Sequence, residues 1–459
     1  MIAAPRDGAG AYFQALRERE FARLDAARLA YLDYTGSALY GASQLARHHE
    51  LLAAGVFGNP HSESAPSRAS GEELERARHE VLEFFDVDAS THAVCFTANA
   101  SGALQRIGES YPFGPERGLV LATDNHNSAL GLREYARRAR APIAYLPLDG
   151  ELRLADPESR LTDLARRRPG GGLLVLPAQS NFSGVRHPLA LVGRARELGF
   201  AVALDLAALA ATAPVSLRST PADFAVLSFY KLFGYPTGIG ALVARHEALD
   251  RLERPWFAGG TVAYASVQAE RHRLRPGPER FEDGTPDFLG LPALAAGFAL
   301  LAEVGLERLG RHVARKTAAY LAALQGLRHT GGGALVELHG PADLEARGGA
   351  VAFNLLTPCG RRIPYPVVEQ RARDAGVALR GGCFCNPGAA EVALGLDAAT
   401  TAKCLARIDD DFSPERFAAC SGGAVGAVRV SFGMATNDDD LTRAIAVLET
   451  FLDEEKPAA

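Results

Sequence analysis

The residue with the clearest chemical potential is a lysine that stands among large apolar side chains. Lys231 follows an apolar run that ends at Leu227, lies between Tyr230 and Leu232, and precedes a loop with three glycines and a proline. Burial of an ammonium group is costly unless a partner or a chemical role offsets it. A desolvated lysine has a lowered pKa and forms Schiff bases with carbonyl cofactors. A strand-end lysine whose stem reaches out to water is the alternative.

Other residues able to bind a ligand follow further apolar runs of strand length: Ala100 and Ser101 after Thr97, His126 after Thr123, Asn181 after Pro177, and Asp205 after Leu204. Ligands of open α/β sheets bind beyond the carboxyl ends of the strands. A helix opening at Ala100 offers free N–H groups to a phosphate. Asp205 suits a protonated pyridine nitrogen, and Lys231 would then lie on the other side of a planar ring. Taken singly, these residues are equally helix caps or loop residues.

The elements that must position these residues alternate along the chain. Helical segments such as 128–140, 157–168 and 189–198 separate seven apolar runs of strand length, at 93–97, 119–123, 143–146, 173–177, 201–206, 224–229 and 240–244. Strands that are apolar on both faces and alternate with helices indicate a parallel sheet covered on both sides. We therefore expect an α/β fold with a large domain built on a mostly parallel, seven-stranded sheet.

The rest of the chain predicts a smaller α+β domain. Its strands are expected at 335–338, 350–356 and 427–432, and loop-like insertions at 331–349 and 396–426. Helices are expected at 10–30, 72–85, 291–327, 364–375 and 438–454, with a short strand at 30–32. We predict an N-terminal segment (1–45) that joins the small domain, a large cofactor-binding domain (46–300) and a small C-terminal domain (301–459).

Two cysteines and two arginines near the end of the chain could bind and attack a substrate. Cys383 and Cys385 follow Gly381-Gly382 and precede Asn386-Pro387-Gly388. Thiolates are strong nucleophiles, and this glycine-rich setting is unlike that of buried structural thiols. A metal site would need a second cysteine pair, and none has suitable spacing. Arg380 and Arg429 carry planar forks suited to a carboxylate, with surface ion pairs as the alternative.

Composition limits the class of partner. The 459 residues carry a formal net charge of −5, which argues against nucleic acid or an anionic membrane as the main partner. No apolar run is long enough to span a bilayer, and the first residues lack a secretory pattern. Six cysteines in so long a chain do not indicate a disulfide framework, so we expect a reducing, cytoplasmic location.

In their order along the chain, these motifs resemble the class V aminotransferase superfamily. They are similar to cysteine desulfurases, and most similar to the desulfurase domain of molybdenum cofactor sulfurases. The resemblance runs from about Tyr31 to Asn437 and is carried by Asn99-Ala100-Ser101, Asp124-Asn125-His126, Ser180-Asn181-Phe182-Ser183-Gly184, Asp205, Ser228-Phe229-Tyr230-Lys231, Gly259-Gly260, Phe281-Glu282-Asp283-Gly284-Thr285-Pro286 and Gly382-Cys383-Phe384-Cys385-Asn386.

The resemblance implies a fold type I enzyme that depends on pyridoxal 5'-phosphate, and it implies residue roles. Lys231 would form the Schiff base and later move protons, Asp205 would hold the pyridine nitrogen protonated, and His126 would stack on the ring. Asn181 would lie near the phenolic oxygen and the substrate. The phosphate would be held by Ala100, Ser101, Ser228 and Tyr230, with Thr285 from the other subunit of a homodimer.

On the substrate side, the resemblance makes Cys385 the nucleophile that takes sulfur from L-cysteine as a persulfide, with release of L-alanine. Cys383 would be a relay or a bystander, and Arg429 would bind the substrate carboxylate with help from Arg380. His61 would lie at the entrance. The sulfur would pass to a separate protein or small molecule, in molybdenum cofactor-type or sulfur-metabolite biosynthesis.

Several positions depart from the family pattern. Tyr230 stands where many desulfurases have histidine, and Ala208 where they have glutamine, which makes Gln179 a candidate partner of the phenolic oxygen. Ala390 replaces a cysteine of the cofactor sulfurases, and the sequence lacks their C-terminal domain, so we expect a stand-alone desulfurase domain. The alternatives are another class V enzyme (aminotransferase, epimerase or C–S lyase), which would not need Cys385, and a non-catalytic sulfur relay.

Overall fold

The large sheet of the protein has the predicted strands. The computed structural model describes residues 8–167, 170–408, 411, 413–423 and 425–455. Seven strands lie in the order β2-β8-β7-β6-β5-β3-β4: β2 (His92–Thr97), β3 (Gly118–Ala122), β4 (Ile143–Leu146), β5 (Gly172–Pro177), β6 (Phe200–Asp205), β7 (Phe224–Ser228) and β8 (Gly240–Arg245). β8 is antiparallel to both neighbours, and the other neighbouring pairs are parallel. The predicted fold class is confirmed.

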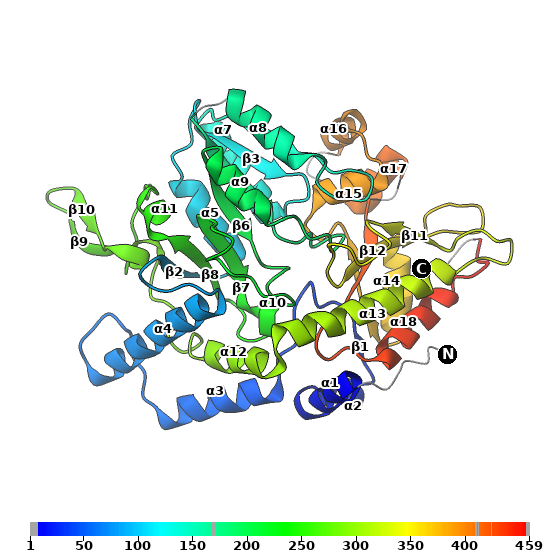
Figure 1. The fold of residues 1–459 in the computed structure, drawn as a ribbon, viewed down its shortest axis with the longest axis horizontal. Helices are drawn as coiled ribbons and strands as arrows, with labels where there is room; N and C mark the ends of the chain where they lie inside the picture. Colours follow the sequence, from blue (N-terminus) through cyan, green and yellow to red (C-terminus); the bar gives the residue numbers. More distant parts are fainter. Residues whose placement is uncertain (1–7, 168–169, 409–410, 412, 424, 456–459) are drawn as a thin grey trace.

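Helices cover both faces of this sheet because successive side chains of each strand point to opposite sides. Val120 and Ala122 join a core with α4 (Ala65–Phe84), α8 (Pro157–Arg167) and α9 (Ala190–Glu197). Leu119 and Leu121 join a second core with α5 (Ala100–Ser110), α7 (Leu132–Arg138) and α11 (His246–Asp250). Figure 1 shows the sheet between these helix layers. The carboxyl ends of the parallel strands are thereby held at one edge.

A second sheet combines strands from the last third of the chain. Its order is β11-β12-β15-β14, formed by β11 (Val336–His339), β12 (Ala350–Leu355), β15 (Ala427–Ser431) and β14 (Arg380–Gly382), with α14 (Tyr365–Asp374) and α18 (Asp438–Glu449) beside it. The N-terminal β1 (Ala30–Tyr31) pairs in parallel with β13 (Val377–Ala378). Residues near 30 therefore lie against the C-terminal part, while the division into domains at 45 and 300 stays a prediction.

Several predicted helices are divided. The single helix expected at 291–327 is α12 (Ala293–Val304) and α13 (Leu306–Gly326), because Gly305 between them has a φ of 75°, which only glycine adopts readily. The helix expected at 10–30 is divided into α1 (Gly8–Glu20) and α2 (Arg23–Ala26), and α3 (Ala42–Ala54) follows them. The helix expected at 128–140 is divided into α6 (Asn127–Leu130) and α7. The predicted end of the 157–168 helix and residues 1–7 of the N-terminal segment lie outside the described residues.

The segment predicted as a loop-like insertion at 396–426 is largely helical. It follows α15 (Pro387–Leu394) and contains α16 (Ala398–Arg407) and α17 (Pro414–Ser421). Asp397 and Ser413 cap the two helices, and a disulfide joins Cys404 to Cys420. The sequence analysis expected no disulfide framework and did not foresee this one bond, which forms because the two helices bring the thiols together. Cys95, Cys359, Cys383 and Cys385 are free.

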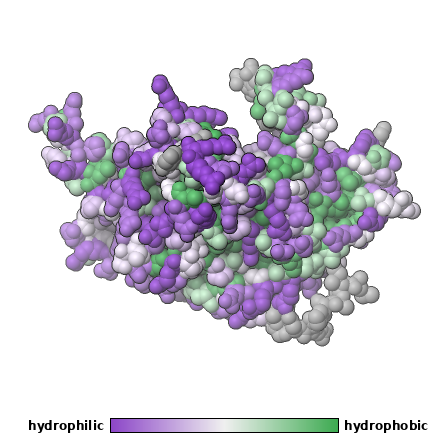
Figure 2. All heavy atoms as spheres, turned by 45° about the horizontal axis from the view of Figure 1, so that its top comes forward, coloured by the Kyte–Doolittle hydropathy of each residue, from purple (hydrophilic) through white to green (hydrophobic). Residues whose placement is uncertain are grey.

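A β-hairpin that the sequence patterns did not predict protrudes from the large sheet. It consists of β9 (Val262–Ser266) and β10 (Arg271–Leu274), and it extends at the left of Figures 1 and 2. Tyr264 and Val267 are 68% and 94% exposed on it.

Among the described residues, no helix is long and apolar enough to cross a bilayer. Those residues also hold no cluster of three metal-ligand side chains.

Candidate active site

Eight of the predicted cofactor residues line one cavity of about 160 Å³ at the carboxyl edge of the large sheet. They come from the ends of different strands and the turns that follow: Ala100, Ser101, His126, Asn181, Asp205, Ser228, Tyr230 and Lys231. Asp205 closes β6, and Lys231 lies on the short helix α10 (Phe229–Phe233) that follows the adjacent β7. The parallel register of these strands brings residues that are far apart in sequence to one place.

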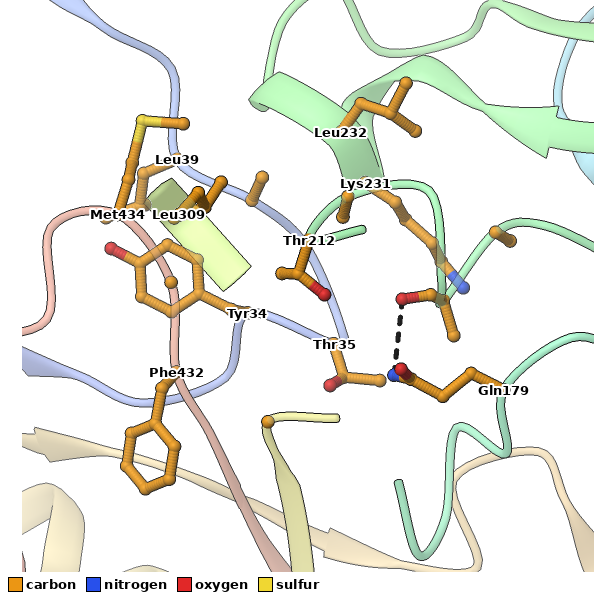
Figure 3. Close-up of a pocket in the computed structure, with 16 residues that line it drawn as sticks. Tyr34, Thr35, Leu39, Gln179, Thr212, Lys231, Leu232, Leu309, Phe432 and Met434 are labelled. Atoms are coloured by element: carbon orange, nitrogen blue, oxygen red, sulfur yellow. Dashed lines mark hydrogen bonds between the residues drawn. The ribbon is translucent and has the colours of Figure 1, made fainter. Parts of the chain in front are cut away.

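The environment of Lys231 disfavours its charged form. Phe229, Leu232 and Phe233 of α10 are buried, and burial lowers the pKa of Lys231, although the negative charge of Asp205 partly opposes that shift. Figure 3 shows the side chain extending from α10 toward the strand end that carries Gln179. A lysine so placed is a better nucleophile and proton carrier at neutral pH than an exposed one.

His126 lies at the opening of α6, where its ring is fixed by the following serine. The Ser128 N–H donates to its Nδ1 over 3.1 Å, and the Ser128 hydroxyl is 3.0 Å from the same atom. Burial lowers the pKa of His126, the nearby Lys231 lowers it further, and Asp205 opposes both. The ring therefore has a defined orientation in the cavity wall.

Hydroxyl and N–H groups of the cavity wall gather around the start of α5. The Ala100 N–H donates to the Ser228 hydroxyl over 2.9 Å, and the Ser101 and Ser128 hydroxyls are 2.5 Å apart. Asn99 caps the helix. A helix N-terminus with several hydroxyls is a ready anion site. Together with Asp205 and Lys231 in the same wall, this set of donors and charges fits the phosphate, ring nitrogen and aldehyde of pyridoxal phosphate.

Gln179 lines the cavity as well, beside Ala208. Its amide N–H donates to the Ala208 carbonyl over 3.3 Å, drawn as a dashed line in Figure 3, and its oxygen accepts from Arg186 Nε over 3.1 Å. A second cavity, of about 30 Å³, shares Gln179, Ala208 and Lys231 with the first and is mostly apolar, with Leu39, Phe432 and Met434 in its wall. Gln179 and Ala208 therefore both lie in the cavity wall, joined by this bond.

The loop that carries Cys385 is attached to the same edge of the sheet. Asn127 N–H donates to the Cys385 carbonyl over 2.7 Å, and the Asn181 amide donates to the Phe384 carbonyl over 2.7 Å. Phe384 and Cys385 both have a φ of 56°, so the backbone reverses there and presents Cys385 to solvent. Cys383 is half-buried. The cysteine is therefore held beside the loops of His126 and Asn181.

Asn386 is a site residue to which the sequence analysis gave no role. Its side-chain N–H groups donate to the Asp124 carbonyl over 2.7 Å and to Asn181 Oδ1 over 2.8 Å, while its oxygen caps α15 by accepting from Ala389. It is fully buried. The Asn-Pro pair that opens a helix was the available signal, since proline favours the first helical position after a capping residue.

The two arginines are held by an aspartate that the sequence analysis did not single out. Arg429 Nη2 donates to Asp33 Oδ1 over 2.9 Å, and Arg380 Nη2 lies 2.7 Å from Asp33 Oδ2. Arg429 is 2% exposed and also donates to the Asn181 carbonyl over 2.7 Å. Burial lowers the pKa of Arg429 against the opposing effect of Asp33, whereas the bond to Asp33 raises that of Arg380. Both arginines are thus in ion pairs near the site.

Six of the predicted residues are not in the wall of this cavity: Cys383, Cys385, Arg380, Arg429, Thr285 and His61. The last two have contacts in another part of the chain. Thr285 is exposed, and its hydroxyl accepts from the Asn59 amide over 3.4 Å. His61 lies beside Gly260 in the same region. Within one chain neither contributes to the cavity wall, so the role predicted for Thr285 requires a second subunit.

The fold and the cavity define an α/β protein of the pyridoxal phosphate type. The aminotransferase class-V family model matches residues 30–443, and the chain belongs to this family. Because the family is one of pyridoxal phosphate proteins, the predicted cofactor is confirmed.

Relatives in other organisms refine the comparison. The chain is 36% identical to a molybdenum cofactor sulfurase of Arabidopsis thaliana and 34% identical to one of Drosophila ananassae, over 94% and 96% of its own length. It spans only 57% and 60% of those relatives. The structure resembles a cysteine desulfurase of Thermococcus onnurineus, with a TM-score of 0.75, 24% identity and coverage of 98% and 99% of the two chains. A cysteine desulfurase of Escherichia coli gives 0.73 at 21% identity, covering 96% and 98%.

Proposed function

We propose that the protein is a pyridoxal phosphate-dependent cysteine desulfurase, which moves sulfur from L-cysteine to Cys385 and releases L-alanine. The observation that carries this proposal is the position of Cys385 on a short loop bonded to the turns that hold His126 and Asn181. A class V enzyme with other chemistry would need Lys231 and Asp205 but no thiol there. The names of the relatives agree with sulfur transfer.

Each residue has a task in this reaction. When bound, pyridoxal phosphate supplies an electron sink for the substrate α-carbon. Arg429, assisted by Arg380, binds the substrate carboxylate, and Lys231 takes the α-proton and later returns it. The Cys385 thiolate attacks the substrate sulfur, an S–S bond forms as the C–S bond breaks, and the bonding electrons stay with the carbon skeleton that becomes alanine. Asp205, His126 and the hydroxyls near Ala100 hold the cofactor.

The partners belong to the same proposal. A separate protein or small molecule would accept sulfur from the exposed Cys385, in molybdenum cofactor-type or sulfur-metabolite biosynthesis. The protein would act as a homodimer in which Thr285 reaches the partner's cavity. The exposed apolar side chains Trp256, Phe257, Tyr264 and Val267, on and near the protruding hairpin, support a protein contact in that region. A cytoplasmic location completes the proposal.

The test is the Cys385→Ser variant, assayed for alanine and sulfide from L-cysteine with dithiothreitol present to reduce the persulfide sulfur to sulfide. We expect sulfide release to fall to background, because serine cannot hold a persulfide, while the cofactor absorbance is kept. Cys359→Ser, at another exposed free thiol, is the matched control and should retain full activity. Cys383→Ser separates a relay from a bystander. Full desulfuration by Cys385→Ser, or pyruvate or racemised cysteine as the main product, would contradict the proposal.

A further inference from the structure

The Asp33 carboxylate lies between the two arginines of the substrate site. Arg380 and Arg429 are direct partners in the register of β14 and β15. Like charges directly opposite each other in a sheet are unfavourable. Asp33 Oδ1 accepts from Arg429 Nη2 over 2.9 Å, and Asp33 Oδ2 accepts from Arg380 Nε over 2.8 Å. One carboxylate therefore joins both guanidinium groups.

The backbone places Asp33 in this position firmly. The chain after β1 continues beside β15, where the Ser431 N–H donates to the Leu32 carbonyl over 2.7 Å and the Thr35 N–H donates to the Ser431 hydroxyl over 2.8 Å. Asp33 is only 8% exposed. Asp33 pairs with Ser431 in an isolated parallel bridge. With its backbone held in this way, its side chain has little freedom to move away from the arginines.

The contacts of Arg429 fix its guanidinium in one plane but do not use every N–H bond. Its guanidinium lies over the Phe384 ring, 4.6 Å from the ring centroid, and its Nη1 donates to the Asn181 carbonyl. Its buried Nε has no partner among the described residues. A guanidinium has five N–H bonds, so Asp33 and Asn181 fix its plane without using all of them.

The net charge of the cluster formed by Asp33, Arg380 and Arg429 favours some carboxylate ligands over others. Two guanidinium groups and one carboxylate leave a single net positive charge. We propose that Asp33 is a positioning and specificity residue of the substrate site, which neutralises one arginine charge so that the cluster accepts one carboxylate group and rejects a second. This inference rests on the proposed function, because it takes Arg429 as the binding residue of the substrate carboxylate.

Removal of the Asp33 charge and removal of the Arg380 charge should change the binding of carboxylates in opposite directions. Asp33→Asn leaves two positive charges, so a dianion gains affinity over a monoanion. Arg380→Gln leaves no net charge, so every carboxylate loses affinity. The double variant, Asp33→Asn with Arg380→Gln, restores one net charge and should restore the preference for a monocarboxylate. A purely structural role of Asp33 would instead make the double variant worse than either single one.

The experiment is titration calorimetry of the holoenzyme with propanoate and malonate at low ionic strength, after cofactor absorbance and melting show each variant folded. We expect malonate to gain about tenfold over propanoate in Asp33→Asn, and propanoate to weaken about tenfold in Arg380→Gln. With L-cysteine, Arg380→Gln should raise KM and leave kcat nearly unchanged. The exposed pair Asp86 and Arg218, 3.4 Å apart, gives matched control variants, Asp86→Asn and Arg218→Gln, which should behave as wild type.

An unchanged malonate-to-propanoate ratio in Asp33→Asn, or a double variant no better than the single ones, would overturn the inference. If the Asp33→Asn variant does not fold, the Arg380→Gln variant is sufficient for the test. An unchanged affinity of that variant for propanoate would overturn the inference. The titrations need no turnover, so a wild type that binds propanoate selectively but releases no alanine from cysteine would contradict the proposed function and leave this inference standing.

Discussion

The chemistry of the site depends first on the burial of one lysine. Lys231 stands between buried apolar side chains of α10, and burial lowers its pKa. The sequence left two possibilities open for this lysine, a desolvated amine with a chemical role and a stem that reaches out to water. The sequence could not show Asp33, since its contact with Arg429 joins residues 396 positions apart, and an aspartate after a short strand is common in turns.

At the residue scale, we predict that Lys231→Met stabilises the cofactor-free protein at pH 7 by about 1–3 kcal/mol, because it removes a buried charge. In the folded protein the pKa of Lys231 lies below 10.5, the ordinary pKa of a lysine. At pH values between these two pKa values, the unfolded chain binds more protons than the folded protein does. Wild-type stability should therefore rise with pH through this window, and the gain of the variant should shrink toward pH 10.5.

Urea denaturation of both proteins at several pH values measures this effect. Lys403→Met, at an exposed lysine on α16, is the control and should show no such pH-dependent gain. A variant that is less stable than wild type at pH 7, or a gain that grows with pH, would show that the ammonium of Lys231 is well stabilised in the folded protein.

At the scale of elements, the sheet was predictable and the breaks between helices were not. Seven apolar runs separated by helical segments leave few alternatives to a parallel sheet. The division of α12 from α13 depends on the backbone of Gly305, and a glycine inside a helical pattern does not by itself indicate a break. The helices α16 and α17 were missed although Asp397 and Ser413 stand at their capping positions, because these short, alanine-containing segments offer few large apolar side chains to mark a helical face.

The attachment of the Cys385 loop gives a prediction at this scale. Asn386→Ala removes the cap of α15 and the bonds to Asn181 and Asp124, so we expect a loss of about 1–3 kcal/mol in stability and a clear fall in kcat for sulfur release. Asn437→Ala removes the similar cap of α18, whose residues do not line the 160 Å³ cavity. It should cost about 1 kcal/mol and leave kcat unchanged. Equal kcat in both variants would contradict a role of Asn386 in holding Cys385.

At the scale of the whole molecule, the proposed homodimer would bring Thr285 of one subunit to the cavity of the other. Thr285 lies outside the cavity of its own chain, and Tyr264 and Val267 are exposed on the protruding hairpin. Neither fact was available from spacing alone, because a single sequence does not separate contacts within a chain from contacts between chains.

The dimer can be tested by complementation. A mixture of Lys231→Ala and Thr285→Ala proteins, unfolded and refolded together, forms some mixed dimers in which one cavity has both an intact lysine and an intact threonine. We expect the mixture to exceed the summed activities of the two variants refolded separately. Activity equal to that sum, or a monomer in size-exclusion chromatography with light scattering, would contradict the shared site.

The central claim is that Cys385 receives sulfur from L-cysteine. The most direct measurement is mass spectrometry of the Cys385 peptide after a single turnover with L-cysteine and without an acceptor, with alanine measured in the same sample. The account predicts one added sulfur atom on Cys385 and one alanine per occupied site. Alanine without sulfur on Cys385, or sulfur only on another cysteine, would contradict it.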